Sequence, residues 1–335
     1  LDGSKNKENL GANSILSVSL AYSRLQAKIN KLSFFQHLHQ KFFSDTTAIL
    51  PVPLVNFING GMHADNNLDI QEFMIMPIAA PSFSEAIRWS AEIFHSLKAI
   101  LKQDNYITAV GDEGGFAPNL ANNRITLNYI MKAINKVGLD CGKDVCIALD
   151  LASSSFYKQG KYHLKGENKI YNTNEFIVYL ENLINEYPII SLEDALAEDD
   201  WQGWQQLTQK IGSKIQLVAD DLFVTNPILL QRGIDETCAN AILIKLNQIG
   251  TLSETITAIK LAKQANYNCI ISHRSGETED NYIADLALAS GCGQIKAGSM
   301  SRSDRLAKYN QLLRLEQQYG FSYANNKINE FKITN

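Results

Sequence analysis

The 335-residue sequence lacks any uninterrupted run of about 18 apolar residues, the length that suggests a membrane-spanning helix. It also lacks an excess of positive charge, because 31 Lys and Arg face 35 Asp and Glu and the formal net charge is -4. We therefore expect no membrane span and no direct binding of nucleic acid, and any anionic ligand must be held by a local cationic site. The 5 cysteines include no Cys-x-x-Cys pair, which is typical of reduced core thiols in a cytosolic protein.

A further absence concerns nucleotide binding: no Gly-x-Gly-x-x-Gly motif follows an apolar run, which argues against the alternative of an open doubly wound sheet. The sequence has instead a series of short apolar runs that end in a charged residue. These runs lie at 145–150, 189–193, 215–220, 241–245, 269–274 and 294–296. Short apolar runs are typical of buried parallel strands. Since the strands of a closed barrel direct their C-terminal ends to one mouth, the charged residues should meet there.

Helical stretches alternate with these runs. They lie at 174–186, 199–211, 227–233, 252–265, 279–290 and 302–319. This alternation predicts an α/β fold of βα units with right-handed crossovers, closed into a TIM-type barrel. The earlier runs end in carboxylates and the later runs in Lys, His and Arg, so the mouth should combine a metal site with a cationic wall.

Two kinds of element precede the βα units. Apolar residues at helical spacing predict helices over 9–30 and 33–43. Extended runs over 49–57 and 68–76 flank a glycine pair and predict a β-hairpin that supplies the first barrel strands. A strongly amphipathic helix follows over 84–103, and Ser84 is its predicted N-cap.

The length allows one barrel and an additional piece, because a TIM-type barrel takes about 250 residues. We expect a helical unit over residues 1–45 and the barrel over residues 46–335.

Three acids end successive strand runs and predict a metal site. Asp150, Glu193 and Asp220 should converge at the mouth, where carboxylate oxygens suit a hard cation such as Mg²⁺. The alternative is that each acid only caps a helix or begins a turn. Asp194 and Asp221 are the immediate neighbours, but side chains alternate along a strand, so only one acid of each adjacent pair is expected to point inward.

The cations that end later runs predict the opposite wall of the mouth. Lys245 and Lys296 should project into it, and a lysine near a metal and a second cation holds its proton less tightly and can act as a general base. Their alternative is a solvated surface position. Arg274 and Ser275 follow the next run and suit phosphate or carboxylate, although Arg274 paired with a helix acid such as Glu279 is the structural alternative.

Glu113 lies in the segment GDEGG, where glycines on both sides allow a sharp turn that exposes an acid at the tip of a loop. As a lone motif the segment also describes an ordinary turn. His63, Gln71 and Glu72 lie on the predicted hairpin or its loop, and a lone histidine is more often structural than catalytic.

Taken together, long ordered segments of the sequence resemble the enolase family. They are LGANSILSVSLA, NGGMHADNN, IQEFMIMP, VGDEGGFAPNL, ISLED, LVADDLFVTNP, LIKLNQIGTLSET, ISHRSGETED and IKAGSMSRSDRLAKYNQLLRLE. The resemblance implies a TIM-like enolase barrel with the order ββαα(βα)6, preceded over 1–45 by the helical remnant of an N-terminal α+β domain. It also implies a hydro-lyase that interconverts 2-phospho-D-glycerate and phosphoenolpyruvate in glycolysis and gluconeogenesis. A lysine base that works with Mg²⁺ on an ene-diolate is a known property of this superfamily.

The resemblance assigns roles at the matching positions. Asp150, Glu193 and Asp220 would bind the first Mg²⁺, which grips the substrate carboxylate. Lys245 would remove the C2 proton and Glu113 would protonate the departing C3 hydroxyl. The implied substrate-binding residues are His63, Gln71, Glu72, Glu193, Asp220, Ser272, His273, Arg274, Ser275 and Lys296. Among them, Lys296 would neutralise the charge that develops on the carboxylate, and Arg274 and Ser275 would hold the phosphate.

Departures from the family pattern accompany the match. The sequence as given begins at Leu1, inside the family's N-terminal domain, and does not contain the serine loop that ligates the second Mg²⁺ in enolases. Two expectations follow: either the sequence is a partial one, or a protein of this sequence lacks the second metal site and is weakly active or inactive. Leu151 stands where the family more commonly has Cys or Ala, and Ser155 stands where it more commonly has Glu.

The resemblance further implies a homodimer and a cytoplasmic location, with export to the cell surface or medium without a signal peptide. Two other hypotheses stay open at this point. One is proton abstraction from a different carboxylate, as in racemases or lactonising enzymes, against which the HRS segment and the GDEGG acid count. The other is a non-catalytic role in binding plasminogen or an RNA-degrading assembly.

Overall fold

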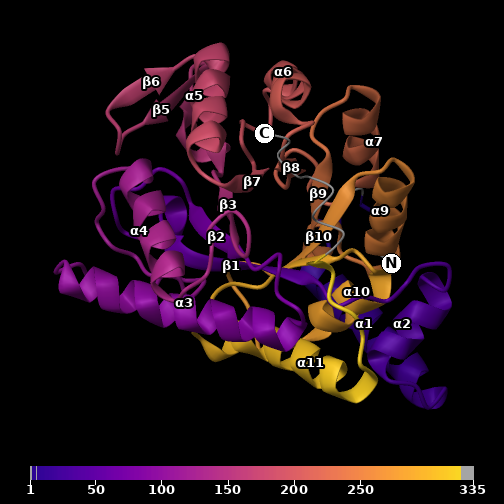
Figure 1. Cartoon of the computed structure of the whole chain (residues 1–335). Helices are drawn as coiled ribbons and strands as arrows, with labels where there is room; N and C mark the ends of the chain where they lie inside the picture. The colour runs from indigo at the N-terminus through magenta and orange to yellow at the C-terminus, as the bar shows by residue number, and fades with distance from the viewer. Residues whose placement is uncertain (1, 5, 326–335) are drawn as a thin grey trace.

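The computed structural model describes residues 2–4 and 6–325. Eight strands close into a barrel in the order β1-β11-β10-β9-β8-β7-β3-β2 (Figure 1). Their bounds are β1 Val52–Asn59, β2 Glu72–Met76, β3 Cys146–Asp150, β7 Ile189–Glu193, β8 Gln216–Ala219, β9 Ala241–Ile244, β10 Asn268–Ser272 and β11 Gln294–Lys296. β2 is antiparallel to both of its neighbours, and the other pairings are parallel. The predicted hairpin and closed barrel are confirmed.

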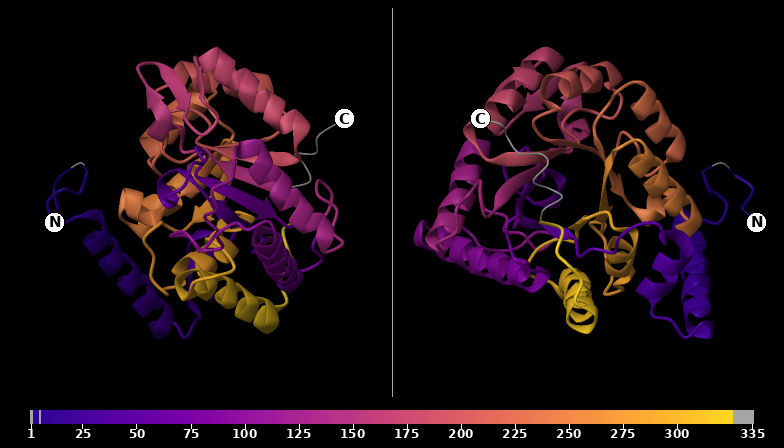
Figure 2. Two further views of the ribbon diagram at one scale, coloured as in Figure 1. Left: turned by 90° about the vertical axis from the view of Figure 1, so that its left-hand side faces the viewer. Right: turned by 45° about the vertical axis from the view of Figure 1, so that its right-hand side comes forward.

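Helices surround the barrel, as the two further views in Figure 2 also show. They are α3 Phe83–Gln103, α4 Asn123–Lys136, α5 Thr173–Glu186, α6 Trp201–Ile211, α7 Pro227–Asp235, α8 Leu246–Ile249, α9 Leu252–Gln264, α10 Tyr282–Ser290 and α11 Ser303–Tyr319. With the strands they give the expected order ββαα(βα)6. The short 3₁₀ turns are Gly61–His63 and Ser153–Phe156. Among the described residues, we find no helix with both the length and the apolar character to span a membrane.

The predicted N-cap of α3 is wrong by two residues. Ser82 accepts the hydrogen bond from the Glu85 N–H and is the cap, whereas Ser84 lies inside the first turn. Both serines precede the same apolar face, so the periodicity alone does not separate them.

The N-terminal helices pack on the barrel. α1 (Ala12–Ile29) and α2 (Phe34–Phe42) lie beside α10 in Figure 1. α10 is buried along almost its whole length, and Asp285 within it accepts a hydrogen bond of 3.1 Å from the Phe35 N–H at the start of α2. α10 therefore forms part of the core between the barrel and this helical piece.

A three-stranded sheet that was not predicted from the sequence lies beside α5, to its left in Figure 1. Its strands are β4 Tyr157–Lys158, β5 Lys161–Leu164 and β6 Lys169–Tyr171, in the order β4-β5-β6. The Tyr162 ring stacks on Phe176 of α5 with centroids 4.5 Å apart, which fixes the sheet over the helix.

Candidate active site at the barrel mouth

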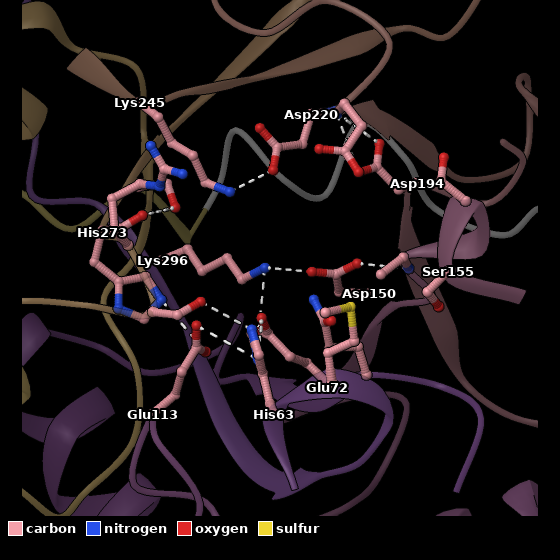
Figure 3. A pocket seen from close by; sticks show the side chains of 18 residues that line it. His63, Glu72, Glu113, Asp150, Ser155, Asp194, Asp220, Lys245, His273 and Lys296 are labelled. Carbon is pink, nitrogen blue, oxygen red and sulfur yellow. Dashed lines mark hydrogen bonds and ion pairs between the residues drawn. The ribbon is translucent and has the colours of Figure 1, made fainter. Parts of the chain in front are cut away.

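A cavity of about 360 Å³ opens at the mouth where the strands end (Figure 3). Its lining residues are Met62, His63, Gln71, Glu72, Glu113, Asp150, Ala152, Ser154, Ser155, Asp194, Asp220, Asp221, Lys245, Ser272, His273, Arg274, Ser275 and Lys296. Every predicted site residue except Glu193 lines this cavity. Segments more than 200 residues apart in the sequence thus meet in one pocket.

Strand register explains the convergence. Asp150 and Glu193 are paired across β3 and β7, and Glu72 is paired with Asp150 across β2 and β3. Lys296 ends β11, and Lys245 follows β9 directly. The predicted meeting of early acids with late cations is therefore what the barrel produces.

Lys296 is the centre of the acidic group. Its Nζ lies 2.9 Å from Asp150 Oδ2, 2.9 Å from Glu193 Oε1 and 3.1 Å from Glu72 Oε2. Burial alone would lower the pKa of Lys296, but Asp150, Glu193 and Glu72 hold it well above its ordinary value. Lys296 is a fixed positive charge buried at the base of the cavity.

Glu193 is a buried carboxyl that lies close to the carboxyls of Asp150 and Asp220. Burial raises the pKa of this carboxyl well above its ordinary value, and Asp150 and Asp220 add to the effect. Its Oε2 is buried and has no hydrogen-bond partner among the described residues. A buried, unpartnered carboxylate oxygen near two further carboxylates suits a hard divalent cation, so the residues present fit a divalent metal ion.

The tightest acid clusters are not identical with the predicted triad. In the described part of the chain, ligand atoms of Asp194, Asp220 and Asp221 all lie within 4.8 Å of one another, as do those of His63, Glu72 and Glu113. Other groups occupy the predicted ligands, because Lys296 lies on Asp150 and Glu193, and Lys245 pairs with Asp220. The assignment of Asp150, Glu193 and Asp220 as metal ligands stays a prediction.

Lys245 was predicted to hold its proton less tightly than an ordinary lysine, but its surroundings raise its pKa. Its Nζ donates to Asp220 Oδ2, and Gln248 Nε2 donates to Oδ1 of the same carboxylate at 2.9 Å. Burial would lower the pKa of Lys245, but Asp220 and Glu193 raise it above its ordinary value. The two carboxylates outweigh the neighbouring cation Lys296, which acts in the opposite direction on the pKa of Lys245.

Glu72 and Glu113 are two buried glutamates near His63, and their pKa values are shifted in opposite directions. Burial and Glu113 raise the pKa of Glu72 well above its ordinary value. Burial would also raise the pKa of Glu113, but His273, Lys296 and His63 hold that pKa well below the usual range. These opposite directions favour the ionised form of Glu113 and the protonated form of Glu72.

His63 connects this pair with the HRS segment. His63 Nδ1 lies 3.5 Å from Glu72 Oε1 and 3.7 Å from Glu113 Oε1, and its Nε2 lies 2.9 Å from Ser275 Oγ. Arg274 donates to Asn247 Oδ1 at 2.6 Å, and no described contact joins it to Glu279. A histidine that was expected to be structural from its local sequence thus lines the site and contacts two of its predicted residues.

Sequence reasoning missed part of the lining. Asp194 and Asp221 both line the cavity. In the first adjacent pair Asp194 lines it in place of the predicted Glu193, and in the second pair both Asp220 and Asp221 line it, although only one acid of each pair was expected to point inward. Asp194 has φ 42, a left-handed conformation that ends the strand alternation, and its carboxylate accepts from the N–H groups of Asp220 and Asp221. Burial and Asp220 raise the pKa of Asp194 well above its ordinary value.

Comparison with known proteins identifies the family of this chain. Residues 47–332 match the family model described as Enolase, C-terminal TIM barrel domain. The chain belongs to the enolase family. It is 56% identical over 328 residues to the enolase of Legionella pneumophila strain Lens, an alignment that covers 98% of this chain and 77% of that protein. The enolases of the strains Corby and Philadelphia 1 are each 55% identical with the same coverage.

Proposed function

We propose that the cavity at the barrel mouth carries out the enolase reaction, the reversible dehydration of 2-phospho-D-glycerate to phosphoenolpyruvate. Membership of the family makes the chain a hydro-lyase of this type. The observation that carries the proposal is the geometry of the cavity, in which Lys296 lies between Lys245 and Glu113 and the two lysines point toward Asp150 and Asp220 (Figure 3).

The difficult step is removal of the C2 proton, because it adds a second negative charge to an already ionised carboxylate. Lys245 is the proposed base, which requires its neutral amine, and a metal ion held by Asp220 would favour that form by engaging the carboxylate that raises the pKa of Lys245. Lys296 is the fixed cation that neutralises the new charge. A divalent ion on the carboxylates would add Lewis-acid stabilisation to the same group. We propose Mg²⁺ for this ion, with Asp150, Glu193 and Asp220 as its ligands.

The departing C3 hydroxyl needs a proton. The glutamate pair is the proposed source, with Glu113 as the group that touches the hydroxyl and Glu72 as the member that retains a proton. Both carboxyls lie within 4 Å of His63 Nδ1, so the proton has a short route between them.

The remaining residues would bind and orient the substrate. Arg274 and Ser275 are the proposed phosphate donors, because a guanidinium and a hydroxyl side by side suit a dianion. Gln71, Ser272 and His273 complete the lining around it.

The first test measures formation of phosphoenolpyruvate from 2-phosphoglycerate with added Mg²⁺. We expect Lys245→Gln to lower kcat by at least about 100-fold. Lys260→Gln, an exposed lysine of α9, is the control and should keep full activity. Equal turnover by both variants would exclude Lys245 as the base.

A second test separates the base from the acid. Exchange of the C2 hydrogen with deuterated solvent requires only the base. We expect Glu113→Gln to lose dehydration by about 100-fold while the exchange persists, and Lys245→Gln to lose both. Loss of exchange in Glu113→Gln would assign Glu113 to the first step instead.

Several finer features are part of the proposal. They are a homodimer, a cytoplasmic location, and the division into a helical unit over 1–45 and a barrel over 46–335. Sedimentation velocity tests the first of these. Export, and binding to plasminogen or an RNA-degrading assembly, stay predictions, and the match to enolases does not favour a purely non-catalytic role.

A further inference from the structure

Arg305, in the first turn of α11, is fully buried at 0% exposure. A buried guanidinium is costly unless its N–H groups are satisfied. Its Nε lies 2.9 Å from Asp304 Oδ2, but its terminal nitrogens point elsewhere. The mechanism described above makes no use of this charge.

The terminal nitrogens of Arg305 bind two loops of the site. Nη1 donates to the carbonyl of Arg274 at 2.6 Å, and Nη2 donates to the carbonyls of Ser275 at 2.6 Å and Asp112 at 3.1 Å. One rigid fork thus joins the loop that carries Glu113 to the loop that follows β10.

The fourth partner is a side chain. Arg305 Nη1 lies 2.5 Å from His273 Nδ1. An arginine has only donors and keeps its proton in proteins, so Nδ1 must be the acceptor and cannot carry a hydrogen. The hydrogen of a neutral His273 is therefore on Nε2, which lies 3.4 Å from Glu113 Oε2.

Burial and the two cations near His273 favour the neutral ring. Burial lowers its pKa, and Arg305 and Lys296 lower it further. Glu113 is the opposing group and raises it, without changing the net direction. These groups come from α11, β11 and the loop of Glu113, so the neutral ring is a property of the whole junction.

We propose that Arg305 is a positioning residue, which fixes His273 as the neutral tautomer with its hydrogen on Nε2 and so aims one carboxylate oxygen of Glu113. Glu113 Oε2 then receives N–H groups from both His273 and Asn56, the latter at 3.1 Å. Oε1 is left on the side of His63, 3.7 Å from its Nδ1. The importance of this for catalysis rests on the proposed function, whereas the tautomer does not.

The first experiment reads the tautomer directly in the unaltered chain. Protein labelled with ¹⁵N in its histidine rings is examined by long-range ¹H–¹⁵N correlation without substrate. The signals of His273 are identified by their loss in His273→Gln. We expect a neutral ring protonated on Nε2 at neutral pH. A ring protonated on Nδ1, or doubly protonated, would overturn the proposal whether or not the protein turns over substrate.

The second experiment compares two buried cations of α11. Arg305→Lys keeps a charge but loses the fork, so we expect a mixture of His273 tautomers and a fall in kcat of about 10- to 100-fold with a smaller change in KM. Lys308 is the matched control: it is 1% exposed, lies one turn further along, and binds Glu277 without touching His273.

Lys308→Gln should leave the His273 signals unchanged even if it lowers stability. An Arg305→Lys protein with the wild-type tautomer and wild-type kcat would contradict the proposal. Tautomer changes of equal size in both variants would also contradict it, since they would indicate a general loosening of α11. If Arg305→Lys does not fold, the spectrum of the unaltered chain decides.

Discussion

At the scale of single residues, the stability of the folded site should depend on the positive charge of Lys296. It contacts Glu72, Asp150 and Glu193, all of which are buried. We expect Lys296→Met, which keeps the side-chain volume, to lower the free energy of unfolding by about 3–5 kcal/mol at neutral pH, because it leaves buried carboxylates without their cation. Urea denaturation measures the change.

The exposed Lys161 of β5 supplies the control for this experiment, and Lys161→Met should change stability by less than about 0.5 kcal/mol. The deficit of Lys296→Met should shrink as pH falls, because protonation removes the uncompensated charge. A Lys296→Met protein as stable as the control would mean that the three acids are already neutral in the folded state.

The buried Asp285 of α10 lies outside the predicted metal site and should make the stability of the protein depend on pH. Burial raises its pKa to about 6. Since the folded pKa lies above the unfolded value, this group contributes stability that is complete below about pH 4 and lost as pH rises through about 6. A shift of this size corresponds to about 3 kcal/mol.

Asp285→Asn removes the titration and keeps an acceptor for the Phe35 N–H. We expect the variant to be more stable than wild type above about pH 7 and equal to it near pH 4, as measured by chemical denaturation across pH. Asp235→Asn, an exposed acid at the end of α7, should show no such crossing. Parallel stability profiles for wild type and Asp285→Asn would show that Asp285 keeps an ordinary acidity.

At the scale of elements, the loop that carries Glu113 packs closely against a neighbouring backbone segment, as the glycines of GDEGG indicated. Gly114 has φ +88, and a Cβ there would lie 2.8 Å from the Ser301 carbonyl oxygen. Ser301 Oγ also donates to the Gly114 carbonyl at 2.7 Å. The loop is therefore held against the segment that follows β11.

Gly114→Ala should consequently displace Glu113 and lower kcat by at least about tenfold, in addition to the roughly 1 kcal/mol cost of a side chain at positive φ. Gly138 has φ +82, but no atom lies within 4 Å of the position that a Cβ would take there, so Gly138→Ala carries the backbone cost alone. Steady-state kinetics and thermal unfolding distinguish the two effects. Equal kcat in both variants would show that the contact with Ser301 does not position Glu113.

Most elements follow from local pattern, and the exceptions have physical reasons. β7 and β11 were predicted with the same ends that the structure shows, because a buried strand has a clear apolar boundary. β4 to β6 were missed since they are two to four residues long, rich in lysine, and stabilised by long-range stacking on α5. Local alternation carries no information about such contacts.

The same limit applies to the site. Residues at strand ends were predictable because a barrel collects them, but Arg305 was not, since it contributes through carbonyls of distant loops. One signal for it exists in the sequence. Arg305, Lys308, Leu312 and Leu315 share one helical face, and two cations within a buried stripe indicate partners inside the fold.

At the scale of the whole molecule, barrel closure concentrates like charge that the unfolded chain keeps apart. Asp150, Glu193 and Asp220 come from β3, β7 and the end of β8. Burial raises the pKa of Glu193, and repulsion from Asp150 and Asp220 raises it further. A ligand that binds only this assembled group must stabilise the folded state.

We therefore expect Mg²⁺ to raise the unfolding temperature of chelator-treated protein, by an amount that grows with the logarithm of the ion concentration. At 100 times the dissociation constant the gain is about 2.7 kcal/mol, which corresponds to a rise of several degrees. Differential scanning calorimetry with and without Mg²⁺ measures it. Glu193→Gln removes one charged ligand from the centre of the group, so it should unfold at a higher temperature than wild type without metal and gain less from the ion. An equal gain in both proteins would place the ion elsewhere, with the cluster of Asp194, Asp220 and Asp221 as the first site to examine.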